Sequence, residues 1–483
     1  MEDTDDRKDG KSARFIVKQG SDISNLNPKE WSTAEKRKTT AIVGLTGFLV
    51  AWSSAIDSAV MKQAKMEFGV SDVTESLATA VFLAAFGLGA LCSGPLSETI
   101  GRLQTYLFSL VLFMVFVMAS ALSPNIGAQI VFRAFSGFFG STPLTTFGGS
   151  TSDMWNPVDR AYVFPVMACL SFLGPFLAPL VGSYIGYTGV LSWRWVEWIT
   201  LIMAALITLL IALFCPETYM PTLLERRAYH FRRCTGDLRF TAESTLHSPD
   251  LKTRLKRNFA RPFILLFSQY VVVFWSIYLS IVYAVLFGFL SGYTFIFGDT
   301  YNMSQGFVGL MFLGMNVGFL VALAICPWIY KKYKQKNDQA IQAGETSAPP
   351  EERLWYAMLA APCFAISLFW MGWTAFPTIS FWSPLLASVM FGFAVQGIFV
   401  SSYLYLIDVF EGLAASALVS LTLSRYLMAS GMVVVATPMY SNLGVHWTLT
   451  LLGCIGVLCT PIPYAFYRYG HQIRARNPPP EMS

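Results

Sequence analysis

Long apolar stretches, separated by short polar ones, recur along almost the whole chain. Six runs of about 20 apolar residues occupy the first half, near 41–60, 77–93, 103–122, 126–147, 163–184 and 196–214. Six more follow, near 272–297, 306–328, 354–375, 383–404, 417–439 and 445–464. A helix of about this length crosses the hydrocarbon core of a bilayer. The pattern therefore predicts an all-α polytopic membrane protein with 12 transmembrane helices.

Polar segments divide these runs into two halves. We expect a disordered cytoplasmic N-tail at 1–40, which lacks the apolar core of a signal peptide, and an N-terminal six-helix bundle at 41–214. A cytoplasmic central loop at 215–261, a C-terminal six-helix bundle at 262–467 and a cytoplasmic C-tail at 468–483 follow. The apolar stretch 262–297 is too long for one upright helix, so we assign 262–270 to an interfacial helix.

Composition supports a membrane protein, since 54% of the residues are hydrophobic and only 13% are charged. Soluble domains carry about 25% charged residues. The net charge of +5 matters through its distribution. With both termini placed inside, 29 of the 34 Lys and Arg lie on the cytoplasmic side, three lie outside, and Arg133 and Arg425 fall within spans. This split follows the positive-inside rule and speaks against a basic patch for nucleic acid.

The sequence contains no motif that is typical of an enzyme or of a metal site. The eight Cys show no metal-ligand spacing, and the four His are scattered in loops. No phosphate-binding loop, HExxH or GxSxG string occurs, so we expect neither an enzyme nor a bound cofactor or metal. The sequon at Asn302 falls in a short outer loop, where we expect it to remain unmodified.

Two strings rich in Gly and Pro stand out. Residues 94–102 (GPLSETIGR) join spans 2 and 3, with Gly94 and Gly101 permitting a turn and Glu98 four residues before Arg102. Residues 174–182 (GPFLAPLVG) lie in span 5, and small residues there allow close helix approach. The simpler interpretations are a loop with a weak surface ion pair and a kinked packing helix.

These strings resemble signatures of the major facilitator superfamily. The first resembles its loop 2–3 motif, and the second resembles the span 5 motif of its drug:proton antiporters, carried by Gly174, Pro175, Pro179 and Gly182. Strings at 148–155 (GGSTSDMW), 193–198 (WRWVEW), 216–219 (PETY) and 369–374 (FWMGWT) resemble the fungal 12-span drug and polyamine:proton antiporters, the DHA1-like branch.

The resemblance covers about 28–474 and implies two six-helix bundles around a central cavity, which is exposed alternately to the two sides of the membrane. It implies that spans 1, 4, 7 and 10 line the cavity and that spans 2, 5, 8 and 11 form the contact between bundles. The Gly- and Pro-rich span 5 would then pack closely against the second bundle.

Ionisable residues inside spans are functional candidates because they are costly there. Asp57 in span 1 would carry the proton or bind a cationic group, with an interfacial Asp as the alternative. Arg133 in span 4 would pair with Asp57 or bind a carboxylate, with a structural pair as the alternative. Further cavity candidates, each with core packing as its alternative, are Tyr278, Tyr283, Asn316, Gln396 and Tyr403.

A second set of charges is expected to control the conformational change. By the resemblance, a cytoplasmic network that stabilises the outward-open state would include Gly94, Glu98, Gly101, Arg102, Asp153, Arg160 and Asp408. We assign Arg425 in span 11 to gating or structure rather than to ligand binding. Glu197, three residues after Arg194, is expected to form an ion pair with it at the outer face.

Together these features predict a proton-coupled antiporter that exports a small organic compound, such as a drug, secondary metabolite or organic acid. The proton gradient is the expected energy source, since no nucleotide-binding motif is present. The alternative is an importer or facilitator of a polyamine or another small solute on the same fold. The expected partners are substrate, protons and lipid, for a monomer in the plasma membrane, with the vacuolar membrane as the alternative.

Overall fold

The computed structural model describes residues 15–17, 27–242, 251–345 and 347–478 of the 483-residue chain. Within these ranges, ten helical stretches are long and apolar enough to cross a membrane. The last stretch holds two crossings, because Gly444 has a φ of 75° and a ψ of 169° and breaks the helix. A further helix of 29 residues, Ile126–Met154, is about 44 Å long and adds one more. The described part of the chain therefore has the predicted 12 spans.

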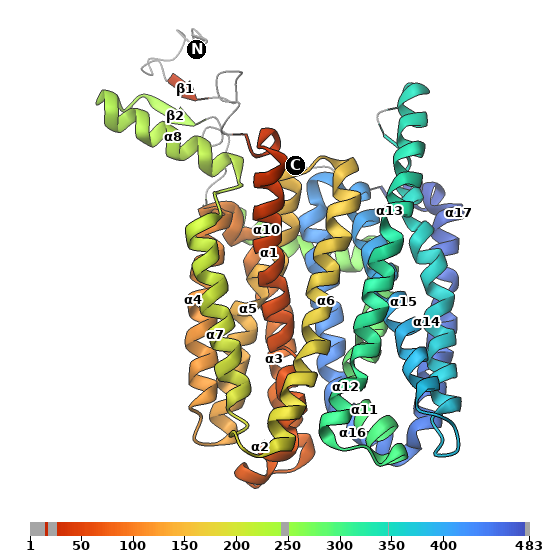
Figure 1. Ribbon diagram of the computed structural model, residues 1–483. Helices are drawn as coiled ribbons and strands as arrows, with labels where there is room; N and C mark the ends of the chain where they lie inside the picture. The colour runs from red at the N-terminus through yellow and green to blue at the C-terminus, as the bar shows by residue number, and fades with distance from the viewer. Residues whose placement is uncertain (1–14, 18–26, 243–250, 346, 479–483) are drawn as a thin grey trace.

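The first bundle comprises α1 (Thr33–Ser53), η3 (Ile56–Val60), α2 (Met61–Phe68), α3 (Asp72–Ile100), α4 (Arg102–Ala121), α5 (Ile126–Met154), α6 (Pro157–Thr188) and α7 (Trp195–Phe214). The second bundle comprises α11 (Tyr270–Tyr293), η4 (Thr294–Asp299), α12 (Gln305–Met311), α13 (Leu313–Gln342), η5 (Pro350–Leu354), α14 (Trp355–Thr374), α15 (Trp382–Phe410), η6 (Glu411–Leu413), α16 (Ala414–Cys459) and α17 (Pro461–Arg476). Figure 1 shows the two bundles side by side, with both termini at the same end, as an even number of crossings requires.

The N-terminal segment is more ordered than expected. A short turn, η2 (Pro28–Glu30), precedes α1, which begins at Thr33 rather than near residue 41. Strand β1 (Phe15–Val17) pairs in parallel with β2 (Phe240–Ala242) beside the amphipathic α8 (Met220–Thr235). The disordered tail expected at 1–40 is therefore corrected for these residues. Residues 1–40 are polar on average, but 15–17 are Phe, Ile and Val, which favour strands. The rest of 1–26 lies outside the described residues.

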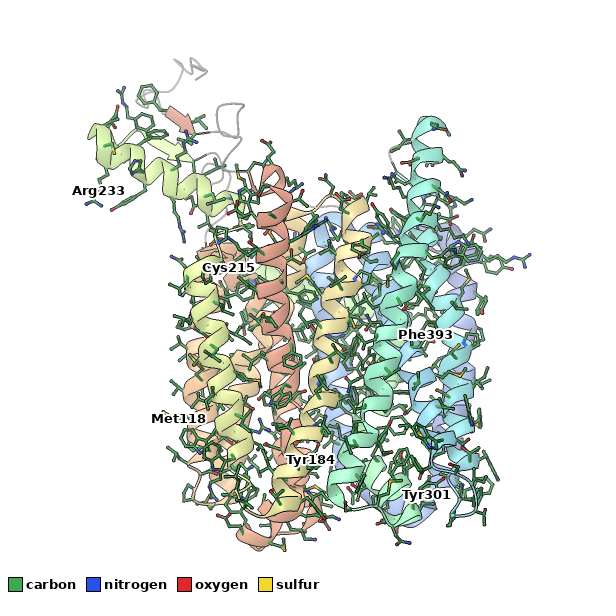
Figure 2. The ribbon with its side chains drawn as sticks, in the orientation of Figure 1. Met118, Tyr184, Cys215, Arg233, Tyr301 and Phe393 are labelled. Atoms are coloured by element: carbon green, nitrogen blue, oxygen red, sulfur yellow. The ribbon has the colours of Figure 1, made fainter. Side chains whose placement is uncertain are left out.

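The expected interfacial helix at 262–270 is part of a longer helix, α10 (Leu251–Ser268). Gln269 has an extended conformation, with a φ of −104° and a ψ of 109°, and separates α10 from α11. At the other end of the second bundle, α17 continues to Arg476, beyond the expected boundary at 467. Met118 on α4 illustrates how apolar side chains point outward from the bundles, as lipid-facing positions require (Figure 2).

The two bundles meet along the helices that the resemblance implied. α3 packs on α16, and α6 packs on α12 and α13, so spans 2 and 11 and spans 5 and 8 form the contact. At the outer part of this contact, Gly309 of α12 lies against Ser183 and the Pro179 carbonyl of α6. Small residues let these backbones approach closely.

The two glycines of the span 5 string have a different role from the one expected. A Cβ on Gly174 would lie 2.5 Å from the Phe48 carbonyl oxygen of α1, and one on Gly182 would lie 2.7 Å from the Ala59 Cβ of η3. Both glycines therefore allow α1 and η3 of their own bundle to pack closely against α6, and they do not face the second bundle. Helical periodicity alone did not say which neighbour the small face meets.

Candidate functional site

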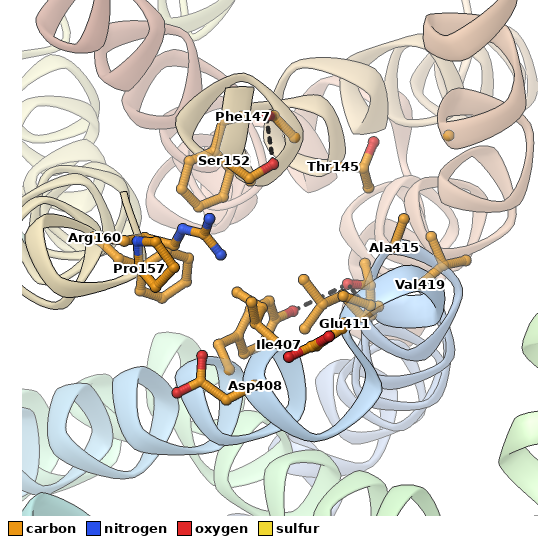
Figure 3. Close-up of a pocket in the computed structure, with 18 of the residues that line it drawn as sticks. Thr145, Phe147, Ser152, Pro157, Arg160, Ile407, Asp408, Glu411, Ala415 and Val419 are labelled. Atoms are coloured by element: carbon orange, nitrogen blue, oxygen red, sulfur yellow. Dashed lines mark hydrogen bonds between the residues drawn. The ribbon is translucent and has the colours of Figure 1, made fainter. Parts of the chain in front are cut away.

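A cavity of about 620 Å³ lies between the two bundles at the end where both termini are found. Residues of α3, α5 and α6 line one side of it, and residues of α13, α15 and α16 line the other (Figure 3). Gly94, Glu98 and Arg102 lie at its mouth, and Phe399 and Arg425 lie at its inner end. Its position between the bundles is that of the central cavity of an alternating-access transporter.

The opposite end of the interface is closed by polar contacts. Gln305 of α12 donates a 2.7 Å hydrogen bond to the Ala59 carbonyl oxygen, and Gln63 of α2 donates a 3.0 Å hydrogen bond to the Gln305 side chain. Gln63 also donates to the Gly186 carbonyl oxygen of α6. Tyr184 contacts Gly306 nearby and lies at this closed end in Figure 2. Among the described residues, these contacts close this end of the interface, so the cavity opens toward the side on which the termini lie.

The first half of the mouth is organised by Arg102. Its Nε donates a 3.1 Å hydrogen bond to Asp153 at the end of α5, and its Nη1 donates a 2.6 Å hydrogen bond to Ser97. Gly101 has a φ of 97°, which favours glycine, and makes the sharp turn from α3 into α4. The buried carboxylate of Glu217 accepts hydrogen bonds from the backbone N–H groups of Arg102 and Leu103, at 2.9 and 3.2 Å.

The second half of the mouth repeats this arrangement. Arg353 pairs with Asp408 at 2.7 Å, as Arg102 pairs with Asp153. Arg353 also donates a 3.2 Å hydrogen bond to the Pro157 carbonyl oxygen of the first bundle. Arg160 and Asp408 face the same opening from opposite bundles (Figure 3).

Sequence reasoning missed both Arg353 and Glu217. Asp153 ends span 4 and Asp408 ends span 10, which are corresponding spans of the two halves, and a comparison of the halves starting from Arg102 would have pointed to Arg353. Glu217 lies within the PETY string, but its role as a helix cap for α4 depends on tertiary contact across the bundle.

A separate group of charges is buried in the outer half of the first bundle. Arg133 forms an ion pair with Asp57, and its Nε lies 3.5 Å from Glu197 Oε1. Its Nη1 donates a 3.1 Å hydrogen bond to the Ser53 carbonyl oxygen. Glu75 of α3 is 3% exposed and lies within electrostatic range of both Asp57 and Arg133. We call Asp57, Glu75, Arg133 and Glu197 the acidic cluster.

The acidic cluster changes two interpretations. Glu197 does not pair with Arg194, which instead pairs with Glu67 and donates to the Ser123 carbonyl oxygen, so the expected outer-face pair is wrong. Glu197 faces inward from the first turn of α7 and accepts from the Ser120 hydroxyl. None of the cluster residues lines the cavity, although the sequence placed Asp57 and Arg133 on its wall. Their predicted role in transport stays a prediction.

The remaining cavity candidates differ in where they lie. Tyr403 lines the cavity, and Tyr283 lines a small void that continues from its inner end. Tyr278 and Asn316 are buried in the second bundle, where Asn316 donates to the Phe312 carbonyl oxygen. Gln396 is also buried and donates a 3.1 Å hydrogen bond to the Pro165 carbonyl oxygen of α6. For Tyr278 and Asn316 the structure thus favours core packing over a place in the cavity.

Arg425 does not join the charges at the mouth. It lines both the cavity and the small void, and its Nη1 donates a 3.1 Å hydrogen bond to the Tyr283 hydroxyl. The sequence grouped it with Arg102 and Asp408, but its surroundings here are aromatic rings. Arg425 therefore lies at the inner end of the cavity, and the gating or structural role expected for it stays a prediction.

Comparison with known proteins agrees with this architecture. The sequence profile described as Major Facilitator Superfamily matches residues 43–433. The chain belongs to the major facilitator superfamily. As a transporter of this superfamily it is not an enzyme.

Superfamily members from fungi are similar over nearly the whole chain. The MFS-type transporter kojT of Aspergillus flavus is 59% identical over 463 residues, which cover 96% of this chain and 82% of that protein. The ascochitine biosynthesis cluster MFS transporter of Didymella fabae is 32% identical, covering 93% and 86%.

Solved structures of the superfamily show the same fold. The proton:xylose symporter XylE, solved with 6-bromo-6-deoxy-D-glucose, has a TM-score of 0.66 at 16% identity, covering 91% of this chain and 96% of that one. The human organic anion transporter MFSD10 has a TM-score of 0.60 at 15% identity, covering 89% and 99%. At these identities the likeness concerns the fold alone.

Proposed function

We propose that this protein is a proton-coupled antiporter that exports a small organic compound from the cytoplasm. The observation that carries the proposal is the acidic cluster, in which Asp57 and Glu197 pair with the single guanidinium of Arg133 and a third buried carboxyl group, Glu75, lies near them inside the first bundle. If all three carboxyl groups were ionised, the buried cluster would carry two net negative charges. Burying unpaired charge costs several kcal/mol, so the cluster is suited to hold and release a proton.

The position of the cluster links it to the closed end of the interface. Asp57 lies in η3, two residues before Ala59, whose carbonyl oxygen accepts the hydrogen bond from Gln305 of the second bundle. A change in the Asp57–Arg133 pair can therefore move the segment that keeps the outer end closed. Coupling of protonation to opening needs such a connection between the proton site and a two-state contact.

Charge and relatives support the proposed direction of transport and the proposed location. Basic residues gather at the end with the cavity mouth, so we place this end and both termini in the cytoplasm, with the protein acting as a monomer in the plasma membrane. One relative is named for a biosynthesis cluster, which supports export of a secondary metabolite. The DHA1-like branch remains part of this proposal, on the motifs of the sequence.

Transport by the purified protein in liposomes tests the proposal. The probes are labelled benzenesulfonate, phenyltrimethylammonium and xylose, which are an anion, a cation and a neutral solute. We expect one of them to accumulate when the lumen is acidic, and we expect nigericin, which collapses the gradient, to abolish the accumulation. Asp57→Asn should reduce the rate at least about tenfold, because it removes a buried carboxyl group from the cluster.

Asp237→Asn is the matched control, since Asp237 forms an exposed pair with Arg239 outside the bundles. It should leave transport unchanged. Accumulation that requires an alkaline lumen would indicate symport and would contradict the proposal, as would accumulation that ignores the gradient. Failure of all three probes to accumulate under either gradient also counts against it.

A further inference from the structure

Arg425 occupies the inner end of the cavity, deep in the membrane. It lies 11 residues after the start of α16, or about 17 Å along the helix. Its side chain is only 2% exposed, yet it belongs to the lining of both the cavity and the small void beyond it. A solute that enters from the mouth therefore meets this guanidinium last.

Within the part of the chain that the structure describes, the charge of Arg425 has no counter-ion. Among the described residues it forms no ion pair with any Asp or Glu, and its Nε has no hydrogen-bond partner. Arg102, Arg353 and Arg133, in contrast, each pair with a carboxylate. A buried guanidinium without an anion is costly, which makes Arg425 a candidate to receive an anion from outside the protein.

Aromatic rings surround the guanidinium and define the shape of the space next to it. The centres of the Tyr283, Phe399 and Tyr426 rings lie 4.4 to 5.0 Å from its central carbon. These faces offset part of the cost of the buried cation but supply no negative charge. The ring centre of Phe399 lies 4.3 Å from that of Tyr403 and 6.2 Å from that of Phe164, so the cavity has flat aromatic walls at this depth.

We propose that Arg425 and these rings form the binding site for the acidic group of a small, planar organic anion, which is the transported substrate. The guanidinium would bind the acidic oxygens through its paired N–H groups, and the aromatic walls would stack against the ring of the substrate. The Tyr403 hydroxyl and the Thr422 hydroxyl, 3.1 Å apart, lie on the cavity wall and offer further hydrogen bonds. The inference rests on the proposed function, because it assigns a substrate class to the same cavity.

The charges at the mouth are compatible with entry of an anion. Asp408 and Arg353 neutralise each other, as do Asp153 and Arg102. Arg160 also lines the cavity and adds a positive charge, whereas Glu98 and Glu411 line it with negative charges. The preference for an anion therefore rests on Arg425 and not on the mouth. The volume of about 620 Å³ lies within the range of small-molecule sites.

Equilibrium binding to the purified full-length protein, without any gradient, tests the site. The probe is labelled benzenesulfonate, with neutral benzenesulfonamide and cationic phenyltrimethylammonium as competitors. We expect saturable binding of benzenesulfonate that neither competitor displaces at equal concentration. Arg425→Gln should weaken it about tenfold or more, whereas Arg425→Lys should retain part of it because the charge remains. Equal binding by wild type and Arg425→Gln would overturn the proposal, as would equal displacement by benzenesulfonamide.

Further variants keep the test decisive. Arg468→Gln removes an exposed arginine of α17 and should bind like the wild type. Leu418 lines the cavity two turns before Arg425, so Leu418→Glu should weaken binding relative to Leu418→Gln even if Arg425→Gln does not fold. Asp237→Asn, in the exposed pair outside the bundles, should also keep full binding. If binding follows this pattern but no gradient drives transport, the proposed function fails while the anion site stands.

Discussion

Gln305 of the second bundle donates a 2.7 Å hydrogen bond from its side-chain amide to the backbone carbonyl oxygen of Ala59 in the first bundle. Because the acceptor is a backbone group, the sequence does not indicate which residue accepts this hydrogen bond. With Gln63 and Gly186 it forms the polar closure of the interface at the end opposite the cavity mouth.

Gln305→Ala should loosen this closure and increase the population of molecules open at that end. Each lost hydrogen bond is worth about 0.5–1.5 kcal/mol, so the equilibrium should shift several-fold. The measurement is the rate at which a membrane-impermeant maleimide labels a cysteine introduced at Ser183, which faces Gly309 in the closed contact. Lys62→Ala, on an exposed neighbour of Gln63, should leave the labelling rate unchanged, and an equal increase there would refute the assignment.

Arg353→Gln should reduce transport more than the loss of an ordinary surface charge. The substitution leaves Asp408 without its partner and removes the 3.2 Å hydrogen bond to Pro157 that crosses between bundles. We expect a loss of about tenfold in rate, equivalent to about 1.4 kcal/mol, at normal amounts of membrane protein, because the substitution leaves an uncompensated charge at the contact between the bundles. In a double-mutant cycle, the combined loss of rate from Arg353→Gln and Asp408→Asn should be smaller than the sum of the two single losses, expressed as free energies. Arg239→Gln, in an exposed pair, is the control, and full additivity would show that the two residues act independently.

Glu217→Gln should lower the thermal stability of the protein. The carboxylate accepts hydrogen bonds from the backbone N–H groups of Arg102, Leu103, Thr218 and Tyr219, and a neutral amide accepts them more weakly. We expect a loss of about 1–3 kcal/mol, seen as a lower melting temperature of the detergent-solubilised protein. Glu225→Gln, on α8 in the same loop, should not change it. An unchanged melting temperature for Glu217→Gln would contradict the capping role.

Gly174→Ala should destabilise the first bundle. The added Cβ would lie 2.5 Å from the Phe48 carbonyl oxygen and 2.8 Å from the Trp52 nitrogen, so α1 would have to move. Overpacking of this kind costs about 1–3 kcal/mol, which melting temperature and yield in the membrane would report. Gly431→Ala is the matched control, because a Cβ at Gly431 meets no atom within 4 Å. Equal effects of the two substitutions would mean that the close approach of α1 is not the cause.

The sequence was sufficient for the number of spans and the pairing of the bundles. Hydropathy carries the number of spans, because the bilayer constrains the length of each apolar run. The pairing of the bundles came from the resemblance to the superfamily. The sequence was not sufficient for the partners of individual charges. Glu197 is three residues from Arg194, and local spacing favoured that pair, but the two side chains point to different neighbours.

Other residues were missed because their roles depend on tertiary placement. Glu75 sits in the first turn of α3, where an acidic residue is ordinary at a helix start, and only the approach of η3 and α5 buries it. Arg425 was grouped with the cytoplasmic charges because its helix forms part of the inter-bundle contact. Its side chain, however, turns toward Tyr283 and the cavity, which only the packing of α11 against α16 decides.

The pairing of β1 with β2 closes the chain from Phe15 to Ala242 into a ring that contains the entire first bundle. The N-terminal strand therefore belongs to the same structural unit as α8, although more than 200 residues separate them. If the gene is divided just after Ala242, the first product contains both β1 and β2 and keeps the ring intact. If it is divided before Phe240, β2 becomes part of the second product and is separated from β1. The two halves made by the first division should reassemble in one membrane more efficiently than those made by the second.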